Sequence, residues 1–186
     1  MENERNRVCP VELADSLDSR IRRWLQNPRK ILAPYIQEGM IILDIGCGPG
    51  YFSLEMAKMV GADGKIISAD LQEGMLQKLH EKVKGTILED RIELVQCRQN
   101  SIPVSEKVDF ILAFYMVHEV PDKNSFFQQL KKTLKDHGQF LLVEPKLFHV
   151  SREEFTQTLR LAESNGFKSI RGPALPFSWS AILEHA

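Results

Sequence analysis

Two periods of apolar residues alternate along the chain from residue 40 onward. Short runs rich in Ile, Leu and Val are separated by longer stretches in which apolar residues recur every three or four positions. The short runs predict buried strands, and the longer stretches predict amphipathic helices that cover them. Strands that alternate with helices in this way pair in parallel, because each crossover helix returns the chain to the same end of the sheet. The pattern therefore predicts an α/β core.

Six strands can be placed from this pattern, and a seventh is expected near the C-terminal end. The six cover residues 41–45, 66–69, 92–96, 108–113, 139–143 and 167–171. The helix before the fifth strand is expected to bury Phe127, Leu130 and Leu134. After Pro173 and Pro176 the chain is expected to turn into a terminal edge strand, because prolines are tolerated at turns and sheet edges.

Capping residues mark where several helices begin. Asn27 with Pro28 predicts the first turn of a short helix, and Asp122 predicts the start of another. Ser151 and Glu154 have the spacing of a capping box. The segment before Asn27 carries an apolar stripe at helical spacing, formed by Leu13, Leu17, Ile21 and Leu25. The expected organisation is an N-terminal helical cover, residues 1–39, and a core, residues 40–186.

Composition and charge narrow the classes of partner. The chain has 186 residues, enough for one domain, and its 24 Lys and Arg nearly balance 25 Asp and Glu. The near-zero net charge therefore gives no electrostatic attraction to nucleic acid. The basic cluster Arg20, Arg22 and Arg23 is interpreted as a solvated helix face. The charged N-terminus is unlike a signal peptide, and no apolar stretch is long enough to span a bilayer. A cytoplasmic protein with no membrane partner is expected.

A glycine-rich turn follows the first predicted strand. In an open α/β sheet such a turn marks the ligand site, and Gly46, Gly48 and Gly50 let the backbone bend tightly and approach a flat ligand. The spacing is GxGxG, whereas a dinucleotide fingerprint requires GxGxxG and Tyr51 stands at its third glycine. Pro49 removes an amide donor and Asp44 adds negative charge, so a phosphate is disfavoured and a cationic ligand such as S-adenosylmethionine is favoured.

An acidic residue follows the second predicted strand. Asp70 lies about twenty residues beyond the glycine turn, where a carboxylate accepts hydrogen bonds from ribose hydroxyls. NAD and S-adenosylmethionine share this ribose, so Asp70 indicates an adenosine-type ligand without choosing between them. The choice depends on the glycine spacing and on Asp44.

Three motifs resemble the class I S-adenosylmethionine-dependent methyltransferases: LDIGCGPGYFS, ISADLQEGML and DFILAFYMVHEVPD. The resemblance extends from Met40 to the C-terminus and is greatest to the small-molecule branch that includes quinone-biosynthesis and arsenite methyltransferases. It implies a Rossmann-like, doubly wound, mostly parallel seven-stranded sheet with an antiparallel C-terminal edge strand. It also implies direct methyl transfer to a small-molecule oxygen, sulfur, carbon or metalloid nucleophile. The NPPY-type loop of nucleic-acid amino-methyltransferases is replaced by AFYMV, which disfavours nucleic acid.

The resemblance also implies which residues hold the cofactor. The glycine turn and Asp44 would contact the methionine moiety, Asp70 the ribose and Leu71 a face of the adenine. Family members commonly place Asp-Ala after the third strand, whereas this chain has Cys97 and Arg98 there; the Arg98 amide and the Gln99 side chain are then candidates for the adenine. The expected cofactor-binding residues are Asp44, Gly46, Cys47, Gly48, Gly50, Asp70, Leu71, Cys97, Arg98 and Phe114.

Candidates for the substrate side follow the fourth and fifth strands. Tyr115 and His118 are expected as catalytic proton handlers, although a structural histidine remains an alternative. Glu144 and His149 extend His118 and Glu119 into a loose set of possible metal ligands, but no HExxH or compact motif is present and no metal is expected. Three cysteines without a CxxC pair indicate reduced thiols, and Cys9, Cys47 and Cys97 are interpreted mainly as incidental or small buried side chains.

Two alternatives remain at this point. A non-catalytic S-adenosylmethionine-binding module would share the cofactor site but lack turnover. A nicotinamide-dependent oxidoreductase is disfavoured by Tyr51 and Asp44.

Calorimetric titration separates the two cofactors. We expect the protein to bind S-adenosylmethionine more tightly than NAD by about tenfold or more, which corresponds to about 1.4 kcal/mol. Tight binding of NAD without binding of S-adenosylmethionine would contradict the interpretation of the glycine turn.

Overall fold

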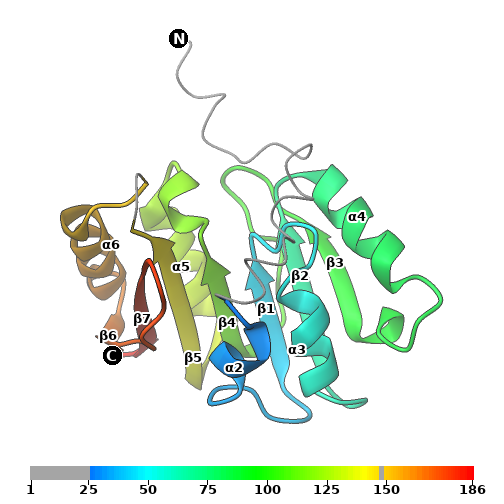
Figure 1. Cartoon of the computed structure of the whole chain (residues 1–186). Helices are drawn as coiled ribbons and strands as arrows, with labels where there is room; N and C mark the ends of the chain where they lie inside the picture. Colours follow the sequence, from blue (N-terminus) through cyan, green and yellow to red (C-terminus); the bar gives the residue numbers. More distant parts are fainter. Residues whose placement is uncertain (1–25, 147–148) are drawn as a thin grey trace.

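The computed structural model describes residues 26–146 and 149–186 (Figure 1). The predicted stripe from Leu13 to Leu25 and Cys9 lie outside the described residues. Helices are α2 (Pro28–Leu32), α3 (Ser53–Met59), α4 (Glu73–Val83), α5 (Lys123–Thr133) and α6 (Arg152–Ser164), with short 3-10 turns η2 (Glu89–Arg91) and η3 (Val117–Glu119). Strands are β1 (Ile41–Ile45), β2 (Lys65–Asp70), β3 (Ile92–Gln96), β4 (Val108–Phe114), β5 (Leu134–Pro145), β6 (Phe167–Arg171) and β7 (Ser178–His185).

Within the described residues, seven strands form one sheet in the order β3-β2-β1-β4-β5-β7-β6. The first five are parallel, and β7 is antiparallel to both of its neighbours (Figure 1). The Rossmann-like, mostly parallel seven-stranded fold with an antiparallel C-terminal edge is therefore confirmed. One detail is corrected: the terminal strand β7 lies inside the sheet, and β6 occupies the outer position. Pro173 and Pro176 lie in the connection before β7, so they remove no hydrogen bond from its ladder.

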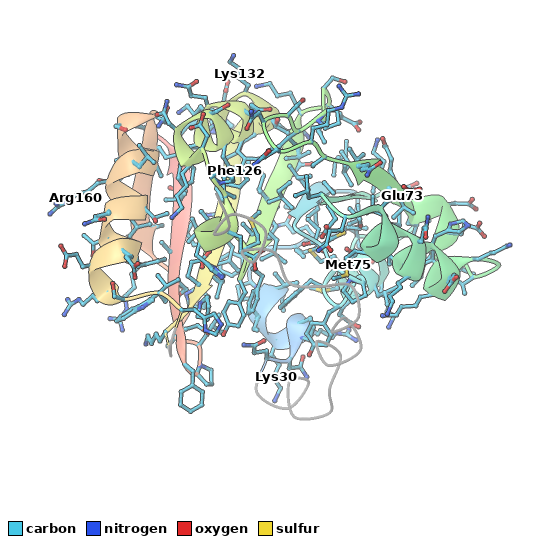
Figure 2. All side chains as sticks on the ribbon, turned by 90° about the horizontal axis from the view of Figure 1, so that it is seen from above. Lys30, Glu73, Met75, Phe126, Lys132 and Arg160 are labelled. Carbon is cyan, nitrogen blue, oxygen red and sulfur yellow. The ribbon has the colours of Figure 1, made fainter. Side chains whose placement is uncertain are left out.

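Alternation along the strands divides the apolar residues between two faces. In β4, Phe110 and Leu112 belong to the core beneath α2, α3 and α4, whereas Ile111 and Ala113 belong to the core beneath α5 and α6. Figure 1 shows these two groups of helices on opposite faces of the sheet. In the view from above, exposed Lys132 of α5 points away from the sheet (Figure 2). The predicted α/β layering follows directly from this period-two pattern.

Capping residues begin three helices where the sequence predicts them. Asn27 accepts a hydrogen bond from the Lys30 amide, and Asp122 accepts one from the Ser125 amide. Ser151 and Glu154 form a reciprocal capping box at the start of α6. The short helix predicted to begin at Asn27 and Pro28 is thus confirmed as α2.

Strand β5 is longer than predicted. Leu134, expected as the last apolar residue of α5, has extended backbone angles and is the first residue of β5, where it pairs with Val108. Gly138 makes room for its side chain, because a β-carbon there would lie 2.5 Å from a terminal methyl of Leu134. Leu130 and Leu134 have helical spacing, so the sequence pattern did not indicate that the helix ends between them.

The carboxyl ends of the parallel strands gather the predicted site residues at one edge. Ile45, Asp70 and Phe114 are the last residues of β1, β2 and β4, and the 3-10 turn η3 follows β4 at the same edge.

In the described part of the chain, no helix is both long and apolar enough to cross a membrane.

Replacement of Gly50 by Ala should cost more stability than replacement of Gly85 by Ala. Both glycines have a positive φ, +87° and +71°, so each variant carries a similar left-handed strain of about 1–2 kcal/mol. A β-carbon at Gly50 would overlap the Leu79 side chain, which adds about 1–3 kcal/mol, whereas one at Gly85 meets nothing within 4 Å. Denaturant unfolding of the two variants measures the difference, and equal losses would contradict this packing argument.

Candidate functional site

A cavity of about 270 Å³ lies at the carboxyl edge of the sheet. Two of its wall residues, Met75 on α4 and Phe126 on α5, are labelled in Figure 2. The wall combines the glycine turn, the end of β2, the turn after β3 and the segment from the end of β4 into α5. Its predicted members are Asp44, Gly46, Cys47, Gly48, Asp70, Leu71, Cys97, Arg98, Phe114 and Tyr115.

The amides of the glycine turn donate hydrogen bonds within the protein. Gly46 and Cys47 donate to the Ala69 carbonyl, at 2.8 and 3.1 Å. The Gly48 amide donates to Asp70 Oδ2 at 2.9 Å, and the Gly50 amide donates to the Cys47 carbonyl. Pro49 has no amide hydrogen. A phosphate cradle requires amides that point at the ligand, so this turn does not form one.

The three glycines serve different steric purposes. All have a positive φ, but a β-carbon at Gly46 would lie 2.7 Å from Met116 Cγ and one at Gly50 would overlap Leu79. A β-carbon at Gly48 would meet nothing within 4 Å, and Gly48 lines the cavity. Gly48 is therefore the glycine that leaves room for a ligand.

Asp44 is held in place by two buried serines. Ser53 Oγ donates to Asp44 Oδ2 at 2.5 Å, and Ser68 Oγ donates to Ser53 Oγ at 2.9 Å. All three side chains are buried. Because the serine hydroxyls orient the carboxylate, it adds a fixed negative charge to the cavity wall.

Asp70 joins the glycine turn to the end of β2. One carboxylate oxygen accepts the Gly48 amide and the other accepts the Gln72 amide, each at 2.9 Å. Burial raises the pKa of Asp70, and the amides oppose that rise by stabilising the charged form. A carboxylate has about four acceptor positions, so acceptor capacity remains for a ribose hydroxyl.

The turn after β3 differs from the expectation for adenine. Arg98 and Ser101 exchange backbone hydrogen bonds, so the Arg98 amide donates to the Ser101 carbonyl and is not directed at a ligand. Gln129 of α5 secures this turn, because its side chain accepts from the Ile102 amide and donates to the Asn100 carbonyl. Leu71, which is 42% exposed, and Cys97 remain as the apolar wall in this region.

Both described cysteines are buried thiols. Burial raises the pKa of Cys47 well above its usual range, with further increases from Asp44 and Asp70. Burial and Asp70 raise the pKa of Cys97 to about 11. The two thiols are therefore protonated at neutral pH, which makes them poor nucleophiles and poor metal ligands.

Aromatic rings form the wall beside the glycine turn. The Phe114 ring lies 4.4 Å from the Phe52 ring and 4.6 Å from the Tyr115 ring, measured between centroids. Tyr115 has a φ of 62°, a left-handed conformation that is uncommon for a bulky residue and that clusters at functional sites. The strained backbone turns the Tyr115 ring onto this wall.

The Tyr115 hydroxyl already has two hydrogen-bond partners. The Gln26 side-chain amide donates to it at 2.6 Å, and it lies 2.5 Å from Ser178 Oγ. Ser178 donates its own proton to the Pro176 carbonyl, so Tyr115 is the donor in the pair with Ser178. Gln26 also accepts the Tyr51 hydroxyl through its backbone carbonyl. Through these bonds Gln26, Tyr51 and Ser178, which lie far apart in the sequence, are joined around Tyr115.

His118 lies between two carboxylates next to the cavity. Its Nδ1 is 2.5 Å from Oε2 of buried Glu144, and its Nε2 is 3.9 Å from Glu119 Oε1. Glu144 Oε1 also accepts the Val117 and His118 amides. Burial alone would lower the pKa of His118, but the hydrogen bond and charge of Glu144, together with Glu119, raise it. His149 contributes a ring contact at 6.0 Å.

The charged residues of the cavity wall are predominantly acidic. Among its described residues the carboxylates are Asp44, Asp70, Glu119 and Asp122, and the cation is Arg98. Such a wall attracts a ligand that carries positive charge. No group of three or more His, Cys, Asp or Glu in the described residues is arranged to hold a metal ion.

The structure brings together most of the predicted site. Gly50 and His118 do not belong to the cavity wall: Gly50 packs on α4, and His118 lies behind its wall neighbour Glu119. Sequence reasoning missed several residues that hold the site in shape, and a polar residue within a buried run, as at Ser68, is the signal that would have indicated one of them. The missed residues are Gln26, Ser53, Ser68, Gln129 and Ser178.

These features fit S-adenosylmethionine. Its two positive charges match the acidic wall, and Asp70 retains acceptor capacity for a ribose. The open space at Gly48 admits a ligand, and the turn lacks the free amides that a dinucleotide pyrophosphate would need. The residues suited to hold it are Asp44, Gly48, Asp70, Leu71 and Phe114.

Comparison of the sequence with known proteins supports the same cofactor. Residues 36–181 match the family model described as a methyltransferase domain. The chain is 27% identical over 123 residues to a demethylmenaquinone methyltransferase from Listeria welshimeri, covering 66% of this chain and 51% of the relative. It is 27% identical over 110 residues to the ubiquinone/menaquinone biosynthesis C-methyltransferase UbiE from Escherichia coli, covering 59% and 44%. The chain thus spans about half the length of the curated relatives it matches.

Solved structures share the whole fold. A SAM-dependent methyltransferase from Aquifex aeolicus superposes with a TM-score of 0.84 at 25% identity, covering 95% of this chain and 98% of that one. A TehB-like SAM-dependent methyltransferase from Corynebacterium glutamicum has a TM-score of 0.74 at 14% identity, covering 95% and 100%, which shows the fold alone. Family, fold and cavity agree on the cofactor. The chain belongs to the class I S-adenosylmethionine-dependent methyltransferases.

Proposed function

We propose that the protein transfers a methyl group from S-adenosylmethionine to a small aromatic acceptor of the reduced-quinone type, at a ring carbon. The observation that carries the proposal is the cavity, which joins the acidic cofactor wall to the rings of Phe52, Phe114 and Tyr115. Aromatic walls bind flat aromatic ligands by stacking. The names of the quinone-biosynthesis relatives support the same acceptor class.

Other acceptor classes receive less support from the described residues. A metalloid such as arsenite is bound by accessible thiols, whereas Cys47 and Cys97 are both buried and have raised pKa values. The acidic wall is also unfavourable for a polyanion such as nucleic acid. A neutral aromatic ring avoids both conflicts.

The bound cofactor supplies an electrophilic methyl group, and the protein supplies position and a proton acceptor. Asp44, Asp70 and the apolar wall hold the cofactor in an acidic, partly dry site, which favours a direct displacement. A hydroquinone becomes a strong carbon nucleophile when a hydroxyl loses its proton. We propose that this proton passes to Glu119 on the cavity wall and then to His118, which Glu144 orients from behind. The ring carbon gains the methyl as the S–CH3 bond breaks, and the hydrogen of that carbon then leaves to restore the hydroxyl and the aromatic ring, so the net proton released is the one on His118.

Tyr115 has a different part in this proposal. Its hydroxyl proton is donated to Ser178, so the hydrogen bonds favour His118 over Tyr115 as the proton handler. Tyr115 shapes the aromatic wall instead.

Transfer of labelled methyl from S-adenosylmethionine to a short-chain demethylmenaquinol tests the function. We expect product with the label on a ring carbon, identified by mass spectrometry and NMR. Asp70→Asn should weaken cofactor binding by about tenfold or more, because it removes a charged hydrogen-bond acceptor from the proposed ribose site. Tight cofactor binding without turnover on reduced quinones, thiols and arsenite would instead support a non-catalytic binding module.

The pH dependence of kcat tests the role of His118. A neutral imidazole is needed to take the proton, so the rate should rise as pH increases through the raised pKa of His118. Glu144→Gln removes the negative charge beside the ring, so the rise should move to lower pH by about one unit or more. His118→Gln should abolish this rise while cofactor affinity stays unchanged.

The charged groups around His118 define the controls. Glu119, Lys123, Glu144 and Glu154 interact electrostatically with it, so single substitutions at these positions also move its pKa. His80→Gln changes an exposed histidine on α4 and should leave the profile as in the wild type. An unchanged profile in Glu144→Gln would contradict the role of the His118–Glu144 pair.

A further inference from the structure

The turn after β3 forms one side of the cavity next to Asp70. We call residues 97–102 the base-side turn. Its first residue, Cys97, follows the end of β3 and donates its amide hydrogen to the Asp70 carbonyl at 2.8 Å. All six residues line the cavity, as do Asp70 and Leu71. Because Asp70 retains acceptor capacity for a ribose hydroxyl, the base attached to that ribose is expected against this turn.

The base-side turn has little regular structure of its own. Its backbone forms an isolated bridge in which Arg98 and Ser101 exchange two hydrogen bonds, at 2.9 and 3.1 Å. Residues 98–101 are exposed, and residues 97–107 contain neither a helix nor a strand. Short exposed segments of this kind open locally at little cost. The position of the turn therefore depends on contacts with the elements around it.

Gln129 of α5 provides such a contact with both atoms of its side-chain amide. Oε1 accepts from the Ile102 amide at 2.9 Å, and Nε2 donates to the Asn100 carbonyl at 3.3 Å. A primary amide accepts and donates at the same time, which neither a carboxylate nor an ammonium group can do. The side chain thus matches two backbone groups of opposite polarity on the base-side turn.

Ser125, one turn earlier on α5, orients the Gln129 amide. Gln129 Nε2 lies 3.3 Å from the Ser125 carbonyl oxygen and 3.2 Å from Ser125 Oγ, and it donates to both. The Ser125 amide is itself held by Asp122 at the start of the helix. Gln129 and Ser125 are only partly buried, and both line the cavity beside Phe126, which is labelled in Figure 2. The Gln129 side chain therefore has a fixed direction at the cavity wall.

We propose that Gln129 is a positioning residue for the cofactor, because it fixes the base-side turn against which the adenine of S-adenosylmethionine binds. Both atoms of its amide already bond to the turn, which favours positioning over direct contact with the ligand. The Arg98 amide is used within the turn, so recognition of the base depends on where the turn lies. The inference concerns the cofactor and does not depend on the proposed acceptor.

Two neighbouring glutamines provide a variant and its control. Gln129→Met keeps a side chain of similar length but removes the amide, and Gln128→Met makes the same change at an exposed position of α5. Calorimetric titration measures Kd for S-adenosylhomocysteine and for 5′-methylthioadenosine, which retains the adenosine but lacks the amino-acid part. Hydrogen–deuterium exchange of the proteins without ligand measures how firmly the base-side turn is held.

We expect Gln129→Met to raise both Kd values by about fivefold or more, and by similar factors, because the hydrogen bonds that hold the adenosine side of the wall are lost. Exchange in residues 97–102 should be faster in this variant, whereas exchange in the glycine turn, residues 46–50, should match that of the wild type. In the wild type, S-adenosylhomocysteine should slow exchange in the base-side turn. Gln128→Met should leave all of these quantities unchanged.

Other results would overturn the inference. Unchanged Kd values in Gln129→Met, or no protection of residues 97–102 by S-adenosylhomocysteine, would contradict it. Faster exchange throughout the chain would indicate a general structural role, and weaker binding with unchanged exchange in the turn would indicate direct contact with the ligand. Weaker binding of S-adenosylhomocysteine alone would place the effect at its amino-acid end. Failure of the wild type to bind S-adenosylhomocysteine would contradict the cofactor itself.

Discussion

The site depends on the attachment of the glycine turn to the end of β2. The Ala69 carbonyl and the Asp70 carboxylate accept the amides of Gly46, Cys47 and Gly48, so the turn cannot move independently of the neighbouring strand. This attachment sets the positions of Asp70 and Gly48 on the cavity wall at once. It also uses the amides that would otherwise bind a phosphate. One set of hydrogen bonds therefore both shapes the cavity and determines the charge class of its ligand.

Around this fixed centre, the cavity combines parts of different burial. Asp44 is buried and oriented by Ser53, whereas Tyr115 on the aromatic side is only partly buried. The buried, charged side suits a cofactor whose chemistry is constant. The aromatic side is formed by side chains from several segments, and it adjoins surface loops that vary more readily than the sheet. This division allows one fold to serve acceptors of different shape.

Much of the fold and the centre of the site can be predicted from sequence because the signals are local. The bounds of β1, β3 and β6 match the apolar runs, and Asp70 is identified by its place at the end of a strand. Apart from the start of β5, the errors arise from long-range contacts. Gln26 bonds to Tyr115 across 89 positions, and Tyr115 bonds to Ser178 across 63, so no local pattern reveals either pair. The same cause hides the place of β7, because strand order depends on pairing partners rather than on the strand's own residues.

The position of β7 between β5 and β6 has a consequence for how the chain reaches its native state. Strand β6 precedes β7 in the chain, yet its backbone pairs with the sheet only through β7. During synthesis, β6 therefore lacks its strand partner until β7 has emerged. Because β7 pairs with both β5 and β6, a substitution in β7 disturbs two strand pairings at once, however far it lies from the cavity.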